Sequence, residues 1–504
     1  MHCQVVYFVN VIPARIPHAL AELPQTLDRT YERVLREIDK ANWEFSHSLF
    51  QFVVVASRPL RVEELADFLA IDFRAGPIPK FQEHWRLGDP VDAVLSTCSS
   101  LLAIVGGGYL SGKVIQFSHF SVREYLMSAS LAESSDIIPR RYHVSMTPAH
   151  TLAAQACLGV LLHLDKDVIT RDGLEKYPSA EYAAAHCVDH VRLGGVSRHV
   201  EDGMKQLFDP DRSHLAIWVW IHDPQFPTRR QTERDKWPLP LTGTPLHYAV
   251  LWGLHIIVKF LVVEHSQDVR CRGLTSMVTP LHLASSKGDV SVARFLLEHG
   301  ADGDARDNNN CIPLHWASQE GHLEVVRDLV ERGIDVNARD HSNWTPLHGA
   351  SQNGHFEVVR CLLEHGANTH ASDQGGWTSL QWPSYNGDPE IVRVLLRYGA
   401  DANTRDNSNW TPLHGASQQG HREVIQVLLE YGADANTHDH SNQTPLHLAS
   451  REGHIGVARL LVESGANVDV RNNEGRTPLE EASAKGHEDV TKLLMGYGGE
   501  GDGF

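Results

Sequence analysis

Paired cysteines, catalytic sequence motifs and long apolar runs are missing from this sequence. Its 504 residues include seven cysteines but no Cys-x-x-Cys pair, which suits buried thiols in a reducing compartment. Neither His-Glu-x-x-His nor Gly-x-Ser-x-Gly occurs, and no apolar run reaches the ~20 residues that a transmembrane helix needs. We therefore expect neither an enzyme nor a membrane protein, and we expect a cytoplasmic location, with the nucleus as the alternative.

Positive charge is also in short supply. Lys and Arg number 45 against 63 Asp and Glu, which gives a net charge of −18. An acidic chain repels phosphate backbones, so nucleic-acid binding is not expected. Histidine is abundant, with 32 copies. Because histidines one repeat apart cannot converge on one ion, we expect structural roles for them, with no metal site and no cofactor.

One glycine-rich stretch has the spacing of a phosphate-binding loop. Gly107 to Lys113 fits Gly-x4-Gly-Lys, but Val114 stands where Ser or Thr should hold magnesium. That motif also needs a helix after the lysine, whereas Val114–Phe117 is apolar and β-prone. We therefore predict a hairpin, with strands at Leu101–Val105 and Val114–Phe117, and no nucleotide hydrolysis.

A hexapeptide frame organises the C-terminal half of the chain. It reads TPLHGA from Thr345 to Ala350, and successive copies begin 35 residues apart once and 33 residues apart six times. Such spacing is typical of a solenoid built from one repeated unit. The first residues of the eight copies are Thr244, Thr279, Ile312, Thr345, Thr378, Thr411, Thr444 and Thr477.

Each position of the frame has a physical role. Thr345 caps a helix, and Pro346 fits its first position because its missing N–H costs nothing there. Gly354 ends this first helix in a left-handed conformation. A second helix follows from Phe356 and stops near Gly366, before a turn-rich finger that leads to the next frame.

These copies resemble the ankyrin repeat, and the resemblance covers residues 239–504. It implies that the fourth frame residue, usually histidine, links the Thr to neighbouring turns by hydrogen bonds. It also implies a long concave surface that binds another protein. The fold class that we predict is mainly α: an α-solenoid of eight ankyrin repeats, preceded by a winged-helix (α+β) domain and a helical segment.

Residues 1–235 contain no repeat. A helix is predicted from about Thr26, a second at Val62–Ala70, and a third that the capping box Ser121–Glu124 opens. Helices followed by a hairpin is the element order of a winged helix. From this pattern we predict an N-terminal helical segment or linker at 1–40, a winged-helix-like domain at 41–130, a helical domain at 131–238 and the repeats at 239–504.

Three strings in this half resemble fungal proteins of the NACHT–ankyrin (NLR-like) type. They lie at Leu23–Arg33, Ser118–Leu126 and Tyr182–His190. In that family the corresponding region is a winged helix and a helical segment that link a signal-transducing NTPase to the repeats. The resemblance implies an NTPase module before residue 15, and we expect this chain to lack it. The resemblance implies a non-catalytic interaction scaffold that forms the sensor half of such a receptor, or else a regulatory clamp on a separate NACHT NTPase.

The predicted partner-binding surface lies on the fingers and the adjoining helix ends of three consecutive repeats. Three tryptophans precede the frame Thr there, and aromatic anchors among neutral polar groups are typical of a binding hot spot. The alternative is that each indole packs on the next finger. The candidate residues are Trp344, Trp377, Trp410, His341, Ser342, Asn407, Ser408, Gln352, Asn353, Tyr385, Asn386, Gln418 and Gln419.

Three repeats depart from the common pattern. The fifth has Gln381 for His and Pro383 at the fifth helical position, which predicts a short or kinked helix at a cost of about 3 kcal/mol. The last repeat carries Glu480 and Glu481, expected on a polar outer face. In the first repeat Leu251–Val263 is apolar nearly all round, and we expect it to dock on the segment near Trp218, Trp220 and Trp237.

Overall fold

The computed structural model describes residues 17–76, 78–98, 100–106, 112–165, 171–193, 196–223, 241–274 and 276–498. The chain divides into two compact units, Met1–Leu241 and Thr242–Phe504. Side chains are described for five cysteines, and all five are unpaired thiols. Within the described residues, no helix is both long and apolar enough to cross a bilayer.

The first unit is mainly helical, with its core around α8. This helix packs against α2, α9 and α10, and Ala153, Cys157 and Leu161 on it are buried. The helices of this unit are α1 (Pro17–Glu37), α2 (Trp43–Val55), α3 (Val62–Leu69), α4 (Pro90–Cys98), α5 (Phe120–Leu126), α6 (Ala129–Ala132), α7 (Ile137–Arg140), α8 (Met146–His163), α9 (Ser179–Val191), α10 (Val196–Phe208) and α11 (His214–Ile221).

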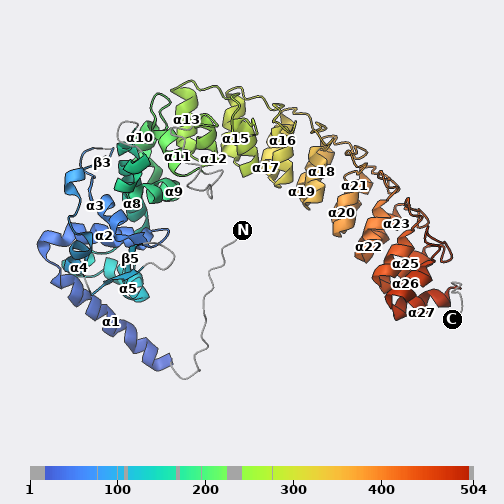
Figure 1. The fold of residues 1–504 in the computed structure, drawn as a ribbon, viewed down its shortest axis with the longest axis horizontal. Helices are drawn as coiled ribbons and strands as arrows, with labels where there is room; N and C mark the ends of the chain where they lie inside the picture. Colours follow the sequence, from blue (N-terminus) through green and yellow to red (C-terminus); the bar gives the residue numbers. More distant parts are fainter. Residues whose placement is uncertain are drawn as a thin grey trace. The chain divides into compact units, whose positions relative to one another are not determined.

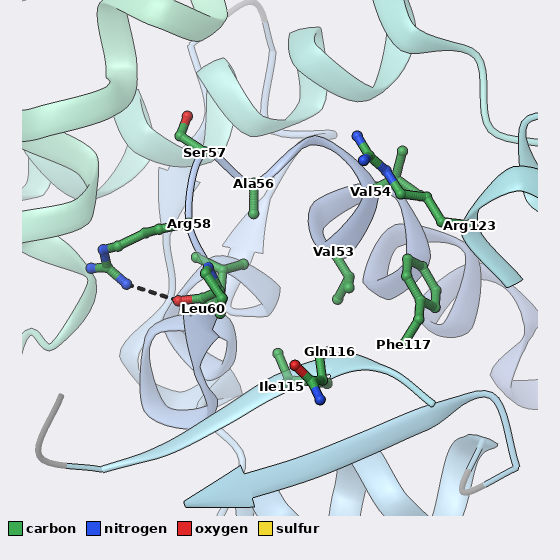
Figure 2. A pocket seen from close by; sticks show the side chains of 11 residues that line it. Val53, Val54, Ala56, Ser57, Arg58, Leu60, Ile115, Gln116, Phe117 and Arg123 are labelled. Atoms are coloured by element: carbon green, nitrogen blue, oxygen red, sulfur yellow. Dashed lines mark hydrogen bonds between the residues drawn. The ribbon is translucent and has the colours of Figure 1, made fainter. Parts of the chain in front are cut away.

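Short antiparallel strands complete this unit. A three-stranded sheet has the order β1-β5-β4, and a two-stranded sheet pairs β2 with β3. In the larger sheet Ile115 pairs with Leu60 on one side and with Ile104 on the other. The strands are β1 (Leu60–Arg61), β2 (Ile71–Asp72), β3 (Lys80–Phe81), β4 (Leu102–Gly106) and β5 (Lys113–Phe117). A pocket of about 240 Å³ opens between the α2–β1 connection and β5 (Figure 2).

The second unit is a row of helix pairs. Each first helix contacts the first helix of the next pair, and from the second pair onward each second helix contacts the next second helix (Figure 1). The helices are α12 (Pro245–Leu251), α13 (His255–Val263), α14 (Pro280–Lys287), α15 (Val290–Glu298), α16 (Pro313–Gln319), α17 (Leu323–Glu331), α18 (Pro346–Gln352), α19 (Phe356–Glu364), α20 (Gln381–Asn386), α21 (Pro389–Arg397), α22 (Pro412–Gln419), α23 (Arg422–Glu430), α24 (Pro445–Glu452), α25 (Ile455–Glu463), α26 (Pro478–Lys485) and α27 (Glu488–Gly496).

The predicted hairpin is confirmed by its two strands. β4 and β5 are antiparallel, with Gly106 opposite Lys113. A strand, and not a helix, therefore follows Lys113, which contradicts a phosphate-binding loop. The connecting residues 107–111 lie outside the described part of the chain. The prediction of a helix at Val62–Ala70 is also confirmed, by α3.

Two predicted helix starts in the first unit were wrong. α1 begins at Pro17 and not near Thr26, because a proline inside a helix removes one backbone hydrogen bond without necessarily ending the helix. α5 begins at Phe120, where His119 is the N-cap and its Nδ1 accepts from the Ser121 N–H at 3.3 Å. An imidazole nitrogen thus takes the role that we had assigned to the Ser121 hydroxyl.

The first and fifth repeats also differ from expectation. The run Leu251–Val263 is split, since α12 ends at Leu251 and α13 starts at His255, with Gly253 left-handed at φ 64° between them. The docking of this run stays a prediction, because Trp237 lies outside the described residues. In the fifth repeat α20 is short, as predicted.

The reason given for that short helix was wrong. α20 starts at Gln381, which places Pro383 at its third position. A helix leaves its first N–H groups without intrahelical partners in any case, so the proline breaks no hydrogen bond there. The expected penalty of about 3 kcal/mol therefore does not apply. The repeat instead starts its first helix two residues later in the frame than its neighbours.

Candidate binding surface

The frame histidines join each repeat to the next. The Thr345 N–H donates to His348 Nδ1 at 3.1 Å, and the Thr345 hydroxyl lies 2.8 Å from the same nitrogen. The other nitrogen, His348 Nε2, lies 3.2 Å from the Trp377 carbonyl oxygen of the following finger. Since Nδ1 accepts, Nε2 carries the proton and donates, which assigns the neutral tautomer.

Two of these contacts, the backbone N–H bond to Nδ1 and the Nε2 bond to the following finger, recur in the other repeats that have this histidine. This recurrence confirms the predicted structural role of the histidine. Burial is the largest influence on each ring and lowers its pKa, to about 4 for His414. The Nε2 partners are the carbonyl oxygens of Val278 for His247, Cys311 for His282, Trp344 for His315, Gln443 for His414 and Arg476 for His447. The pKa is also lowered for His247, His282, His315, His348 and His447.

A second set of histidines links each repeat to the one before it. His355 Nε2 lies 2.9 Å from the Gln319 carbonyl oxygen. The ring needs the space beside Gly321, where a Cβ atom would come within 2.5 Å of His355 Nδ1. His322, His421, His454 and His487 make equivalent contacts. Among the described side chains, no three potential metal ligands converge.

The fingers are shaped by aspartates at a fixed position. Asp340 Oδ1 accepts from the N–H groups of Ser342 and Trp344 at 2.7 and 2.8 Å. Asn343, between them, has φ 63°, a left-handed conformation that asparagine tolerates better than most residues. The tip therefore turns tightly and exposes His341 and Ser342.

Two of the three predicted anchor tryptophans donate a hydrogen bond to the next finger. Trp344 Nε1 donates to Asp373 Oδ2 at 3.1 Å, and Trp377 Nε1 donates to Asp406 Oδ2 at 3.0 Å. Both rings are half-buried. Trp410 is half-buried too, but its Nε1 is buried without a partner among the described residues. The geometry of Trp344 and Trp377 therefore favours packing between fingers over a freely available anchor.

Sequence reasoning missed a fourth tryptophan in this cluster. Trp382 on α20 lies 4.6 Å from the Trp377 ring and 6.2 Å from the Trp344 ring, measured between centroids. It occupies the fifth frame position, where Trp316 stands two repeats earlier. That recurrence was the available signal, but the irregular frame around Pro383 hid it. The described contacts thus gather Trp344 and Trp377 around Trp382, without Trp410.

The predicted polar residues fall into two groups. Three exposed amides link their repeat to the preceding one. Their Nδ2 groups donate to backbone oxygens at 2.9 Å: Asn353 to Gln319, Asn386 to Gln352 and Asn407 to Gln374. The rest have no side-chain hydrogen bond to the described residues. Of these, His341, Ser342, Tyr385, Ser408 and Gln419 are exposed, whereas Gln352 and Gln418 are half-buried.

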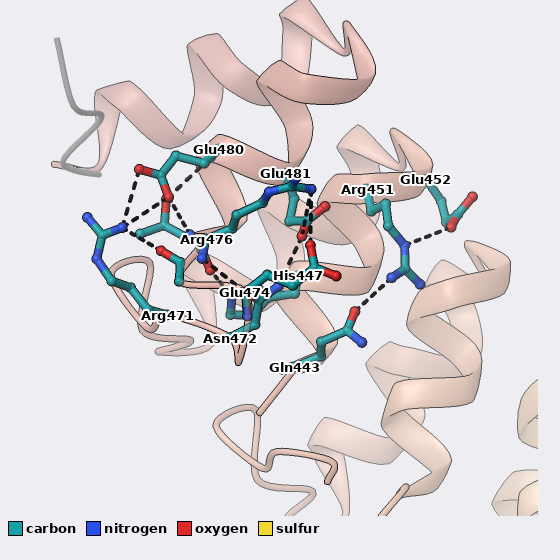
Figure 3. A network of polar contacts seen from close by, with 12 residues as sticks. Gln443, His447, Arg451, Glu452, Arg471, Asn472, Glu474, Arg476, Glu480 and Glu481 are labelled. Atoms are coloured by element: carbon teal, nitrogen blue, oxygen red, sulfur yellow. Dashed lines mark hydrogen bonds and ion pairs between the residues drawn. The ribbon is translucent and has the colours of Figure 1, made fainter. Parts of the chain in front are cut away.

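The last junction of the row is held by a polar network (Figure 3). Asn472 Nδ2 donates to Glu481 Oε1 at 3.0 Å, and Arg476 lies 3.8 Å from the same oxygen. Arg471 pairs with Glu480 at 3.2 Å. The expectation that Glu481 lies on the outer face was wrong, since it is only 4% exposed. The amide of Asn472 satisfies this buried carboxylate.

Comparison with known proteins identifies the repeated unit. Models of ankyrin repeats match residues 246–340, 338–406 and 413–502, and a second ankyrin model matches 384–429. "Azaphilone pigments biosynthesis cluster protein L" of Monascus ruber is 29% identical over 294 residues, which cover 56% of this chain and 61% of that protein. This chain therefore spans about three fifths of that relative's length.

Two further matches cover smaller parts of this chain. "Protein phosphatase 1 regulatory subunit 27" of Mus musculus is 44% identical over 64 residues, which cover 13% of this chain and 40% of that protein. The crystal structure of the human ASB11 ankyrin repeat domain aligns at 28% identity with a TM-score of 0.41, over 45% of this chain and 100% of that domain. Because models of ankyrin repeats together match residues 246–502, this chain is an ankyrin-repeat protein.

Proposed function

We propose that this chain is a non-catalytic protein-interaction scaffold with eight ankyrin repeats, whose partner binds on the concave face at the finger tips. One observation carries the proposal: exposed side chains at His341, Ser342 and Ser408 bond to no other described residue, while their neighbours hold the fingers in place. A rigid row of repeats is suited to binding a protein when its tip side chains make no hydrogen bond to the described residues. We assign it to the cytoplasm, with no nucleic acid or membrane as ligand.

We further propose that residues 41–130 form a winged-helix module, preceded by a segment at 1–40 and followed by a helical domain at 131–238. The order of elements supports this: α2, β1, α3, α4, then the β4–β5 hairpin, in one sheet with β1 at its edge. Such a module suits the sensor half of an NLR-like receptor. The alternative function is a regulatory clamp that acts on a separate NACHT NTPase through this module.

A pull-down with the two halves separates these functions. Residues 1–235 and 242–504 are expressed separately beside the full chain, each checked for folding by circular dichroism, and used as bait in the same extract. The sensor function predicts that the repeats retain the partners of the full chain. If residues 1–235 retain them and the repeats do not, the sensor assignment is wrong and the clamp is favoured.

A further inference from the structure

The pocket of the first unit is lined mostly by apolar residues, together with Ser57 and Gln116, and has positive charge at its ends (Figure 2). Val53, Leu60 and Phe117 line its middle, with Arg58 and Arg123 on opposite sides. Its lining includes no Asp or Glu, although the chain as a whole carries −18. At about 240 Å³ it is smaller than typical small-molecule sites of ~300–1,000 Å³ and suits one or two side chains of a larger partner.

The two arginines are not equivalent. Arg58 is held by Glu64, whose buried carboxylate accepts from both terminal nitrogens at 2.6 and 2.9 Å. Arg123 is exposed, and no other described residue pairs with it. An arginine of this kind can take a carboxylate through two parallel hydrogen bonds. Arg123 is therefore the available charge in the pocket.

A free strand edge lies beside the same pocket. Ile115 of β5 pairs with Leu60, and β1 extends no further along this edge. The Ser118 N–H donates to Leu101 at 2.9 Å, on the β4 side. Because successive residues of a strand bond to opposite sides, the N–H and C=O of Phe117 point to the β1 side, beyond the end of β1.

Nothing in the described chain takes up these two groups. Neither the N–H nor the C=O of Phe117 bonds outside its own sheet. In the register of β1 and β5, Arg58 lies opposite Phe117, and no backbone hydrogen bond joins these two residues. An open edge of this kind can accept an added strand.

We propose that this pocket binds an extended acidic segment of a partner protein. The segment adds a short strand along Phe117, places a carboxylate on Arg123, and inserts one apolar side chain between Val53 and Leu60. Charge complementarity selects an acidic partner, and the strand edge selects an extended peptide. This interface is separate from the finger tips and does not depend on their function.

The test starts from a displayed library of random heptapeptides selected on the full chain, with binders to the Arg123→Glu variant removed. The strongest peptide becomes a fluorescein-labelled probe for anisotropy. We expect an apolar residue flanked by Asp or Glu, at least tenfold weaker binding to Arg123→Ala, and a smaller loss for Arg123→Lys. N-methylation of the peptide backbone at the paired position should weaken binding similarly.

Controls separate this result from unfolding and from charge alone. Arg123 is exposed and unpaired among the described residues, so its variants should keep the wild-type melting temperature. A peptide with Lys in place of each acidic residue should not bind. Any of three results would overturn the proposal. The library yields no saturable binder, Arg123→Ala binds the peptide as well as wild type does, or oligothymidine displaces the labelled peptide.

Discussion

At the scale of single residues, the frame histidines decide how well one repeat holds the next. From a buried ring, each accepts from its own repeat through Nδ1 and donates to the following finger through Nε2. Gln381 shows what is lost without the imidazole: its Oε1 still accepts from the Thr378 hydroxyl at 2.9 Å, but its Nε2 is buried without a partner. The shorter amide keeps the hydrogen bond to Thr378 and loses the hydrogen bond to the following finger.

The first prediction concerns pH and His414. Burial lowers its pKa in the folded state to about 4, so below about 6.5 the unfolded chain binds protons that the folded chain does not. The free energy of unfolding should therefore fall as pH drops from about 6.5 towards 4, and His414 should not affect its pH dependence above that range. Between pH 6.5 and 5 this one residue should cost about 2 kcal/mol.

Urea unfolding of wild type and His414→Gln at pH 7.5 and pH 5 measures this. At pH 7.5 the variant should be less stable by about 1–3 kcal/mol, because the Gln443 carbonyl loses its donor. Between the two pH values the variant should lose less stability than wild type. Equal losses in the two proteins would contradict the assignment of His414 as a buried neutral donor.

The Thr–His cap could be expected from the frame and its family resemblance. The carbonyl that receives His348 Nε2 lies one repeat further along, so its identity depends on how repeats stack. The same limit applies to the tryptophans. The sequence placed Trp344 before the frame Thr, but its bond to Asp373 exists only between two stacked fingers.

At the scale of elements, the glycines that end first helices have two separate roles. Gly420 has φ +80°, and a Cβ there would also come within 2.8 Å of the His454 ring. Gly432, which follows a second helix, has φ +85° with nothing within 4 Å of the same position. The two positions thus separate backbone conformation from close packing.

The second prediction uses this matched pair. Gly432→Ala should cost about 1–2 kcal/mol, because only the left-handed backbone opposes the methyl group. Gly420→Ala should cost at least about 1 kcal/mol more, since His454 must also move and weaken its 3.0 Å bond to the Gln418 oxygen. Urea unfolding at pH 7.5 compares them, and equal costs would show that the histidine ring yields freely.

The third prediction concerns α20. This helix spans six residues, whereas α22 spans eight, so fewer amides are protected at its start. Hydrogen exchange should be faster at 379–385 than at the corresponding segments of the neighbouring repeats.

Pro383→Ala tests the cause. Because Pro383 breaks no hydrogen bond in α20, replacing it should change global stability by less than about 1 kcal/mol. Exchange at Trp382 should slow if alanine lets the helix start at its usual frame position, because the Trp382 N–H would then reach the Thr378 carbonyl oxygen. A gain near 3 kcal/mol would instead mean that the proline strains this helix.

A short helix was foreseen from Pro383, but the shift in its start was not. In the shifted helix Gln381 takes the first helical position, while its Oε1 still accepts from the Thr378 hydroxyl. The sequence of one frame alone does not show this arrangement. The β4–β5 hairpin was likewise readable from apolar runs. The use of His119 as an N-cap was not, because imidazole is uncommon in that role.

At the scale of the whole molecule, the chain folds into two compact units. Repeats, their spacing and their helix pairs followed from the sequence, because 33-residue periodicity leaves few alternatives. The binding surface followed only in part. Finger tips such as Ser342 and Ser408 stay candidates, whereas Asn353, Asn386 and Asn407 serve the links between repeats, which no single repeat could show.

The proposed function rests on partner binding at the finger tips. Its most direct test is affinity purification with quantitative mass spectrometry, using the full chain and its Ser342→Arg/Ser408→Arg variant as baits. A matched control, Gln426→Arg/Ser464→Arg, adds the same charge at two exposed positions, one in α23 and one at the C-cap of α25. We predict at least a tenfold loss of the captured partner for the tip variant, none for the control, and melting temperatures within about 2 °C of wild type. Full retention of the partner by the tip variant would contradict the claim.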